Sequence, residues 1–246
     1  MGAAMCSSDS HIDPAKNLPA GSSDHYSAFV GPPDQYDFMG ATQFRLLCAL
    51  GLREDHALLD FGCGSLRAGR LLIPYLKRGG YFGIDPNKWL IDDAIKDEIG
   101  EWLVRKKNCR FDYNDNFDSS VFGVKFDFVI AQSIFSHAGR AQVLKCLEGF
   151  RNNIEDDGII AATFVVSENN ESEYVGDEWV YPACVSYSED TIAYFASTCS
   201  LKYVRIPWYH PRQSWFLFAK SARNLPDAGT AAKHLQGQVL KNQPIA

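Results

Sequence analysis

The chain has 246 residues, 46% of them hydrophobic and 22% charged, with a formal net charge of -6 at pH 7. Its aromatic content of 13% argues against a disordered chain, and its length fits one domain with appendages. The acidic balance disfavours nucleic acid as a partner, because phosphate binding usually leaves a basic surface. No apolar stretch approaches the roughly 20 residues of a membrane helix, and the first residues lack the pattern of a secretory signal. We expect a soluble, cytoplasmic protein without a membrane partner.

Seven cysteines lie at irregular spacing, with no CxxC pair among them. This spacing predicts neither a disulfide framework nor a zinc site, and we expect no bound metal. Both ends of the chain lack periodic apolar residues, so residues 1–35 are interpreted as a flexible N-terminal tail or cover and residues 223–246 as a C-terminal tail. Residues 36–222 then form one domain, within which residues 167–187 are a polar, aromatic insertion on the acceptor side. The oligomeric state is left open.

Between the two ends, apolar runs of strand length alternate with segments of helical period. This alternation predicts a parallel sheet with crossover helices. In chain order the first half contains a helix around Met39–Leu50, a strand at Ala57–Phe61, a helix that starts after Ser65 and ends at Gly79, a strand at Tyr81–Ile84, a polar helix over roughly Lys88–Leu103 and a weak strand near Arg110–Tyr113.

The second half opens with a largely apolar strand, as expected for a strand covered on both faces. Its predicted elements are that strand at Phe126–Ala131, a helix capped by Ser136, a turn at Asp156–Gly158, a strand at Ile159–Val166, a helix with Ile192 and Phe195 inward, and strands at Leu201–Ile206 and Trp215–Lys220. The last two strands have no helix between them, so we expect an antiparallel hairpin.

The strongest local signal is the run LLDFGCGSLRAG at residues 58–69. Here a buried strand ends in glycines that let the backbone approach a ligand, and the following helix N-terminus offers N–H groups to an anion. Arg67 stands where the dinucleotide fingerprint has Gly or Ala, which counts against NAD. Asp85 lies at the tip of the next strand, where a carboxylate can accept hydrogen bonds from both hydroxyls of a ribose.

On these residues the chain resembles the class I S-adenosylmethionine-dependent methyltransferases, over roughly residues 37–220. The resemblance implies an α/β fold with a doubly wound, seven-stranded, mostly parallel sheet of order 3-2-1-4-5-7-6, whose last strand is antiparallel. It implies S-adenosyl-L-methionine as cofactor, with the glycine loop at the methionine part, Asp85 at the ribose and Asp115 at the adenine amino group. The implied cofactor site comprises Asp60, Gly62, Cys63, Gly64, Arg67, Asp85, Pro86, Asn87, Asp115, Gln132 and Ser133.

The residues after the fourth strand discriminate between classes of acceptor. Enzymes that methylate nucleic-acid amino groups carry Asp/Asn-Pro-Pro-aromatic there, and cytosine-5 enzymes carry a nucleophilic Cys after Pro; the chain has neither. Gln132 and Ser133 also lack the acidic ligands of cation-dependent enzymes. We therefore expect metal-independent transfer to an oxygen or nitrogen of a small molecule, by in-line displacement. The residues expected to contact the acceptor are Tyr36, Phe135, Trp179 and Tyr181.

Two histidines are candidates for the general base that an acceptor hydroxyl would need. His137 leads because it follows the fourth strand, although packing against the cofactor would explain it equally well. His210 is second, because the loop that leaves a parallel sixth strand emerges at the carboxyl edge of the sheet, where ligands bind; an exposed hairpin turn is its alternative explanation.

Two other functions remain open at this point. A protein or peptide methyltransferase would suit the aromatic insertion if that segment formed an open groove, and a closed pocket would oppose it. A non-catalytic cofactor-binding protein of the same fold would have its acceptor pocket filled by the tails.

Overall fold

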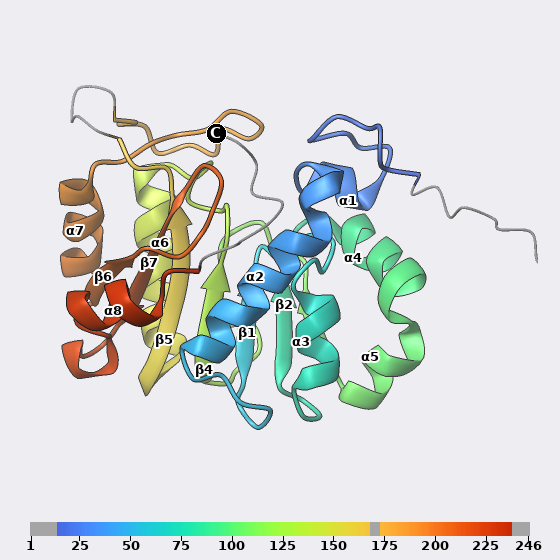
Figure 1. Ribbon diagram of the computed structural model, residues 1–246, viewed down its shortest axis with the longest axis horizontal. Coiled ribbons are helices and arrows are strands. Elements are labelled where there is room, and N and C mark those ends of the chain that lie inside the picture. Colours follow the sequence, from blue (N-terminus) through green and yellow to red (C-terminus); the bar gives the residue numbers. More distant parts are fainter. Residues whose placement is uncertain (1–13, 168–172, 238–246) are drawn as a thin grey trace, which may run out of the picture.

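The computed structural model describes residues 14–167 and 173–237. Parts of the expected tails (residues 1–13 and 238–246) and of the insertion (residues 168–172) lie outside the described residues. The centre of the molecule is a seven-stranded sheet of order β3-β2-β1-β4-β5-β7-β6 (Figure 1). Its strands are β1 (Leu58–Phe61), β2 (Tyr81–Ile84), β3 (Arg110–Asp112), β4 (Phe126–Ala131), β5 (Ile154–Phe164), β6 (Lys202–Ile206) and β7 (Ser214–Ala219).

Strand β7 runs antiparallel to both of its neighbours, β5 and β6, while the other pairs are parallel. The expected fold class, strand order and terminal hairpin are therefore confirmed. In β1 and β2 every residue is buried, as a parallel strand covered on both faces requires.

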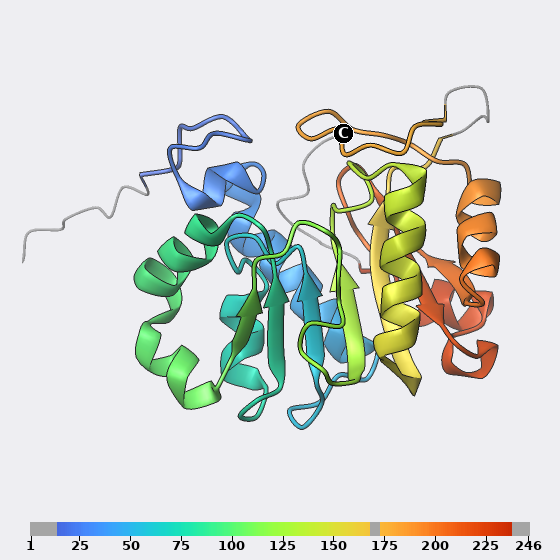
Figure 2. The same ribbon diagram turned by 180° about the vertical axis from the view of Figure 1, so that it is seen from behind.

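Helices cover both faces of the sheet and enclose two apolar cores (Figures 1 and 2). One core lies under α2 (Tyr36–Ala49), α3 (Gly69–Tyr75), α4 (Lys88–Ala94), α5 (Glu101–Lys107) and α8 (Ala228–His234). The other lies under α6 (Arg140–Asn153) and α7 (Glu189–Thr198), on the face that Figure 2 turns towards the viewer. The helix α8 belongs to the part of the chain expected to be a tail, and its Ala231 is buried in the first of these cores.

Two helices differ from the sequence prediction. The single polar helix expected over Lys88–Leu103 is divided into α4, a π-helical turn η2 (Ile95–Ile99) and α5, because Gly100 adopts a φ of +86° that ends the first helical segment. Helix α6 is capped by Gly139, whose N–H donates to Gln142 Oε1 over 3.0 Å. The expected cap, Ser136, is instead buried before the helix, and its hydroxyl donates to the Ser133 carbonyl.

The expected turn at Asp156–Gly158 lies within β5, which begins five residues earlier than the apolar pattern indicates. Ile154 already pairs with Phe126, and a register shift follows before Ile159 pairs with Phe128. The exposed carboxylates of Asp156 and Asp157 thus belong to an irregular but extended strand. Polar composition alone favoured a turn there.

Two segments far apart in the sequence cross the carboxyl edge of the sheet (Figures 1 and 2). The first contains α1 (Tyr26–Phe29) and a 3₁₀ turn η1 (Pro33–Gln35), and the Tyr26 hydroxyl holds it to Glu98 over 3.0 Å. The second is residues 173–187, which is held to the chain after β4 by a hydrogen bond from Val180 N–H to the His137 carbonyl. Between them these segments roof the ends of the parallel strands. A second 3₁₀ turn, η4 (Ala222–Asn224), follows β7.

None of the described helices is long and apolar enough to cross a membrane. Within residues 14–167 and 173–237, no group of three or more His, Cys, Asp or Glu side chains is placed to hold a metal ion.

Candidate functional site

A cavity of about 940 Å³ lies at the carboxyl ends of β1, β2 and β4, and both roofing segments contribute to its wall. Its wall brings together most of the residues that the sequence singled out. The predicted residues that line it are Asp60, Gly62, Cys63, Gly64, Arg67, Asp85, Pro86, Asn87, Asp115, Gln132, Ser133, His137, Trp179 and Tyr181.

The glycine loop after β1 is shaped by close backbone approach. Gly62 and Gly64 have φ angles of +74° and +50°, and a Cβ on Gly62 would lie 2.0 Å from Ile134 Cδ1. Only glycine fits such a position without displacing its neighbour. Between them Cys63 is buried, and burial raises the pKa of its thiol well above the ordinary value. Cys63 is therefore a neutral packing residue of the loop.

Asp85 links the tip of β2 to the glycine loop. Its Oδ2 accepts a hydrogen bond from Gly64 N–H over 2.9 Å, and its Oδ1 accepts from the backbone N–H and the side-chain amide of Asn87 over 2.8 and 3.0 Å. Burial raises the pKa of Asp85, against the lowering effect of the hydrogen bonds from Asn87 and Gly64. The carboxylate is held in one orientation and keeps lone pairs for a ligand.

Asp60 and Arg67 form the polar base of the loop. Asp60 accepts a hydrogen bond from the Tyr81 hydroxyl over 2.8 Å, and burial raises its pKa to about 6. Arg67 donates from NH1 to the Val30 carbonyl over 3.1 Å, which ties the first roofing segment to this loop. The Nε of Arg67 is buried and has no partner among the described residues.

The predicted adenine contact, Asp115, is exposed at the rim of the cavity. Its loop is held by Asn114, whose side-chain amide donates to the Asp118 carbonyl over 3.1 Å while its oxygen accepts from Asp118 N–H over 3.0 Å. The loop therefore has a defined shape, although Asp115 itself is not fixed by a hydrogen bond to another described residue.

Gln132 and Ser133 follow β4 directly. Ser133 adopts a φ of +61°, and its N–H donates to Thr163 Oγ1 over 2.8 Å. Gln132 is only 8% exposed, and its Oε1 has no partner among the described residues. A buried, unpartnered amide at the wall of a cavity is a candidate ligand contact.

His137 has a defined tautomer. Its Nδ1 lies 2.6 Å from the Ala183 carbonyl, which can only accept, so Nδ1 carries the proton and Nε2 keeps a lone pair. The imidazole centroid lies 5.0 Å from that of Tyr181 and 5.7 Å from that of Trp179. Burial lowers the pKa of His137, the hydrogen bond to Ala183 opposes this, and the charge of Arg212 lowers the pKa further. The ring is therefore neutral at physiological pH.

His210 is engaged in the opposite way. Its Nδ1 accepts hydrogen bonds from the backbone N–H groups of Arg212 and Gln213 over 3.2 and 3.0 Å, and its Nε2 lies 3.5 Å from Gln132 Nε2. Burial lowers the pKa of His210 to about 3. The lone pair that a base would need is thus occupied by backbone donors.

Two predicted acceptor contacts lie away from the cavity wall. Phe135 is fully buried in the core, where its ring centroid lies 4.9 Å from that of Phe164. Tyr36 is also buried, and its hydroxyl donates to the Ser65 carbonyl over 2.8 Å behind the glycine loop. Trp179 and Tyr181, in contrast, face the cavity and are 42% and 38% exposed.

The sequence analysis missed several residues of the wall. They are Phe29 and Val30 of the first roofing segment, Gln43, Phe117, Gln142, Cys184, Arg212 and Gln213. Arg212 and Gln213 stand two and three residues after His210, so the argument that placed this loop at the carboxyl edge applies to them as well. The others come from elements whose approach to the edge depends on tertiary packing.

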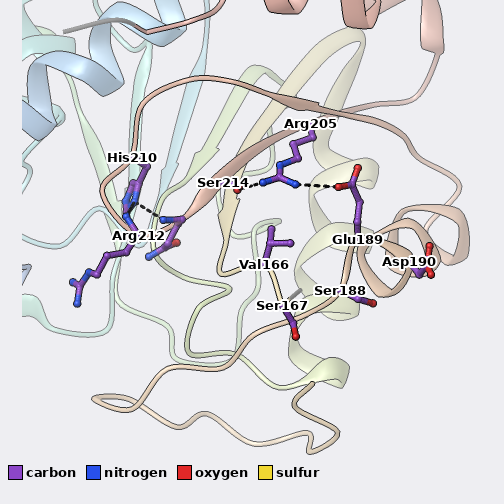
Figure 3. Close-up of a pocket in the computed structure, with 10 residues that line it drawn as sticks. Val166, Ser167, Ser188, Glu189, Asp190, Arg205, His210, Arg212 and Ser214 are labelled. Carbon is purple, nitrogen blue, oxygen red and sulfur yellow. Dashed lines mark hydrogen bonds and ion pairs between the residues drawn. The ribbon is translucent and has the colours of Figure 1, made fainter. Parts of the chain in front are cut away.

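A second cavity, of about 630 Å³, adjoins the first beyond β5 and β7 (Figure 3). His210 belongs to its wall, and Arg212 and Gln213 line both cavities. Arg205 spans this wall with hydrogen bonds to Glu189 over 3.2 Å and to Ser214 Oγ over 2.9 Å.

Comparison with known proteins gives one family match, in which residues 59–160 match the model of a methyltransferase domain. A comparison with curated proteins finds no match. The solved structures similar to this chain include the magnesium protoporphyrin IX methyltransferase of Synechocystis PCC 6803 with bound SAH, at 13% identity and a TM-score of 0.56 over 77% of this chain and 84% of that one.

Two further structures show the same fold. An S-adenosylmethionine-dependent methyltransferase of Clostridium acetobutylicum ATCC 824 has 14% identity and a TM-score of 0.55, over 74% of this chain and 92% of that one. The glycopeptide N-methyltransferase MtfA has 12% identity and a TM-score of 0.56, over 74% and 90%. The chain spans 56% of the length of another similar structure, the pyocyanin biosynthetic protein PhzM.

Proposed function

Because the chain has the fold of the class I S-adenosylmethionine-dependent methyltransferases and carries a methyltransferase domain over residues 59–160, we propose that it transfers a methyl group to an oxygen or nitrogen of a small-molecule acceptor, without a metal ion. Its cofactor is S-adenosyl-L-methionine, which supplies the methyl group on a sulfonium. The observation that carries the proposal is His137 Nε2, an unprotonated nitrogen at the wall of the large cavity.

The residues on the β1–β2 side of the cavity fit this cofactor. Asp85 suits two ribose hydroxyls, because its oriented carboxylate keeps lone pairs after bonding to Gly64 and Asn87. Arg67 Nε is buried and unpartnered within the described residues, and it suits the carboxylate of an amino acid. Gly62 and Cys63 supply the backbone that approaches it, and Pro86 and Asp115 border the adenine.

In the proposed reaction His137 is the general base. A hydroxyl of the acceptor gives its proton to Nε2, and Nδ1–H remains bonded to the Ala183 carbonyl, which orients the ring throughout. Its lowered pKa keeps the imidazole neutral, and therefore basic, at physiological pH. The acceptor oxygen then attacks along the line of the bond that breaks. Holding both reactants in this alignment contributes about 7–11 kcal/mol in well-oriented reactions.

The roof of the cavity favours a small acceptor over a protein. The Tyr181 hydroxyl lies 3.4 Å from the Phe29 carbonyl, and the two rings are 5.7 Å apart, so the two roofing segments meet above the site. A volume of about 940 Å³ is within the range of small-molecule sites. A peptide acceptor would require the contact between Tyr181 and Phe29 to open. A non-catalytic cofactor-binding protein would have no need of an unprotonated His137 Nε2 at the cavity wall.

Two measurements test the proposal. Calorimetry with S-adenosyl-L-homocysteine should give a single site per chain, and Asp85→Asn should weaken it. Incubation with S-adenosylmethionine and mixed pools of small hydroxyl and amine compounds should release S-adenosylhomocysteine. Absence of cofactor binding would overturn the whole proposal. Binding without turnover on any pool would favour the non-catalytic alternative, and turnover on peptides only would favour the peptide enzyme.

A further inference from the structure

The wall of the large cavity is divided by charge. Its three carboxylates, Asp60, Asp85 and Asp115, all come from the ends of β1, β2 and β3. The described residues that line the cavity after β4 and β5, in the insertion and between β6 and β7 include no carboxylate. That second half contains one cationic side chain, Arg212. Such a distribution favours an anionic ligand in the half next to His137.

Arg212 makes no hydrogen bond or ion pair with its side chain to another described residue. The acidic residues that share the second cavity with it are Glu189 and Asp190, and Glu189 is already paired with Arg205 over 3.2 Å. Figure 3 shows the Arg212 side chain directed away from both acids. Its charge also lowers the pKa values of His137 and His210, as expected of a cation near both rings. A guanidinium in this position has donors free for an oxyanion.

His210 connects Arg212 to a second donor, the Gln132 amide. Because Nδ1 of His210 accepts from two backbone N–H groups, its Nε2 carries the proton in the neutral ring. The Gln132 NH₂ group and the protonated Nε2 of His210 are both donors, so they cannot hydrogen-bond each other. The stable arrangement exchanges the two ends of the Gln132 amide. Its oxygen then accepts from His210, and its NH₂ group takes the position of the unpartnered oxygen. One imidazole thereby holds both the backbone segment that carries the Arg212 guanidinium and the amide of Gln132.

Aromatic side chains surround the remaining space. The centroids of Trp179 and Phe117 lie 5.9 Å apart, and the His137 ring lies between Trp179 and Tyr181. A planar ring fits such a wall, because offset and edge-on contacts between aromatic rings are favourable. An acceptor that satisfies both the rings and the guanidinium combines an aromatic body with an oxyanion.

On this basis we propose that the acceptor is an aromatic hydroxy-carboxylate, whose carboxylate binds Arg212 and the Gln132 amide while its hydroxyl faces His137. The proposal rests on the function proposed above and specifies its substrate class. In the reaction the hydroxyl proton would pass to His137 Nε2 and the oxygen would form a bond to the methyl carbon. The bond from that carbon to sulfur would break with its electron pair going to sulfur, so that the neutral thioether of S-adenosylhomocysteine leaves, and the carboxylate would remain bound and unchanged.

The test is a binding measurement on the full chain saturated with S-adenosylhomocysteine. Calorimetry compares para-hydroxybenzoate and salicylate with their neutral amides, at constant ionic strength. We expect the carboxylates to bind about tenfold or more tightly than the amides, the size of one charge-assisted hydrogen bond. Arg212→Gln should abolish that preference, and Arg212→Lys should retain part of it because the charge remains.

Arg205→Gln is the matched control, because Arg205 is a neighbouring cation already paired with Glu189. It should leave the preference for carboxylates unchanged. Equal affinity for acids and amides, no binding of either carboxylate at millimolar concentration, or a preference that survives Arg212→Gln would each overturn the inference. Binding of S-adenosylhomocysteine is measured first for every variant. Its absence in the unmodified chain overturns the proposed function, and its presence without an anion preference overturns only this inference.

Discussion

The β1–β2 half and the β4–β5 half of the cavity differ in how far their polar groups are satisfied within the described chain. In the first half, both oxygens of Asp85 and one of Asp60 accept hydrogen bonds from the protein. In the second, the side-chain amides of Gln132 and Gln213 each leave a buried polar atom without a partner among the described residues, and Arg212 forms no ion pair with a described acid. The first half is preorganised for one ligand, whereas the second contains groups that a ligand must complete. We therefore expect a change of acceptor compound to alter contacts in the β4–β5 half only.

The largest expected effect separates chemistry from cofactor binding. His137→Ala should lower kcat on a hydroxyl acceptor by about 10²–10⁴-fold, the usual contribution of a general base. The affinity for S-adenosylhomocysteine should change little, because His137 lies in the β4–β5 half of the cavity and the proposed cofactor contacts are mainly in the β1–β2 half. Steady-state kinetics and calorimetry measure the two quantities. His234→Ala, at the exposed end of α8, is the matched control. An unchanged kcat would make His137 a packing residue.

The second-largest expected effect is a loss of cofactor affinity on substitution in the β1–β2 half. Asp85→Asn keeps the shape of the side chain but replaces charge-assisted hydrogen bonds to two hydroxyls by neutral ones. The affinity for S-adenosylhomocysteine should fall by about 10–100-fold. Asp115→Asn alters an exposed carboxylate at the rim and should have a smaller effect, because solvent screens it. Equal effects of the two substitutions, measured by calorimetry, would contradict the ribose role of Asp85.

A third prediction probes the contact that joins the two halves. Gly62→Ala places a methyl group 2.0 Å from Ile134 Cδ1 and should lower the free energy of unfolding by about 1–3 kcal/mol. Combining it with Ile134→Ala removes the clash, so the double substitution should cost less than the sum of the two single ones. Urea denaturation of all four proteins gives the coupling energy. Additive effects would show that Ile134 moves aside freely.

The smallest expected effect is a shift in a pH profile. In the proposed mechanism the neutral form of His137 is the base, so kcat/KM should fall as the pH drops below the pKa of His137, which burial holds under the ordinary 6.5. Removing the positive charge by Arg212→Gln should raise that pKa and move the acid limb to higher pH. A pH–rate profile of both proteins checks the direction. A limb that stays at the same pH would place Arg212 too far from His137 to act on it.

Much of the sheet could be predicted from sequence because its signals are local. The apolar runs of β1, β2 and β4 are buried on both faces, and these strands alternate with helices along the chain. The glycine loop and Asp85 were recognisable because close backbone approach requires glycine and a strand tip presents the next residue. The break at Gly100 and the cap at Gly139 were missed. Glycine can adopt several backbone conformations, and the residues around these two positions do not indicate which one is chosen.

The site was less predictable than the sheet. Phe135 follows β4 as His137 does, yet one packs into the core and the other lines the cavity, because the backbone turns at Ser133. Nothing local distinguishes the tautomers of His137 and His210 either. Each is selected by backbone groups, the Ala183 carbonyl in one case and the N–H groups of Arg212 and Gln213 in the other.

The sequence by itself determined the fold class, through the alternation of apolar strands with segments of helical period, and the motif after the first strand predicted the cofactor. These depend on periodicity and on glycine, which are properties of short stretches. Only the tertiary structure decided the rest of the cavity wall, because α1, the insertion and the β6–β7 connection, which contribute to it, are distant in sequence. The charge of that wall is likewise a tertiary property: the chain as a whole has a net charge of -6, yet the described residues that line the cavity after β4 include Arg212 and no carboxylate.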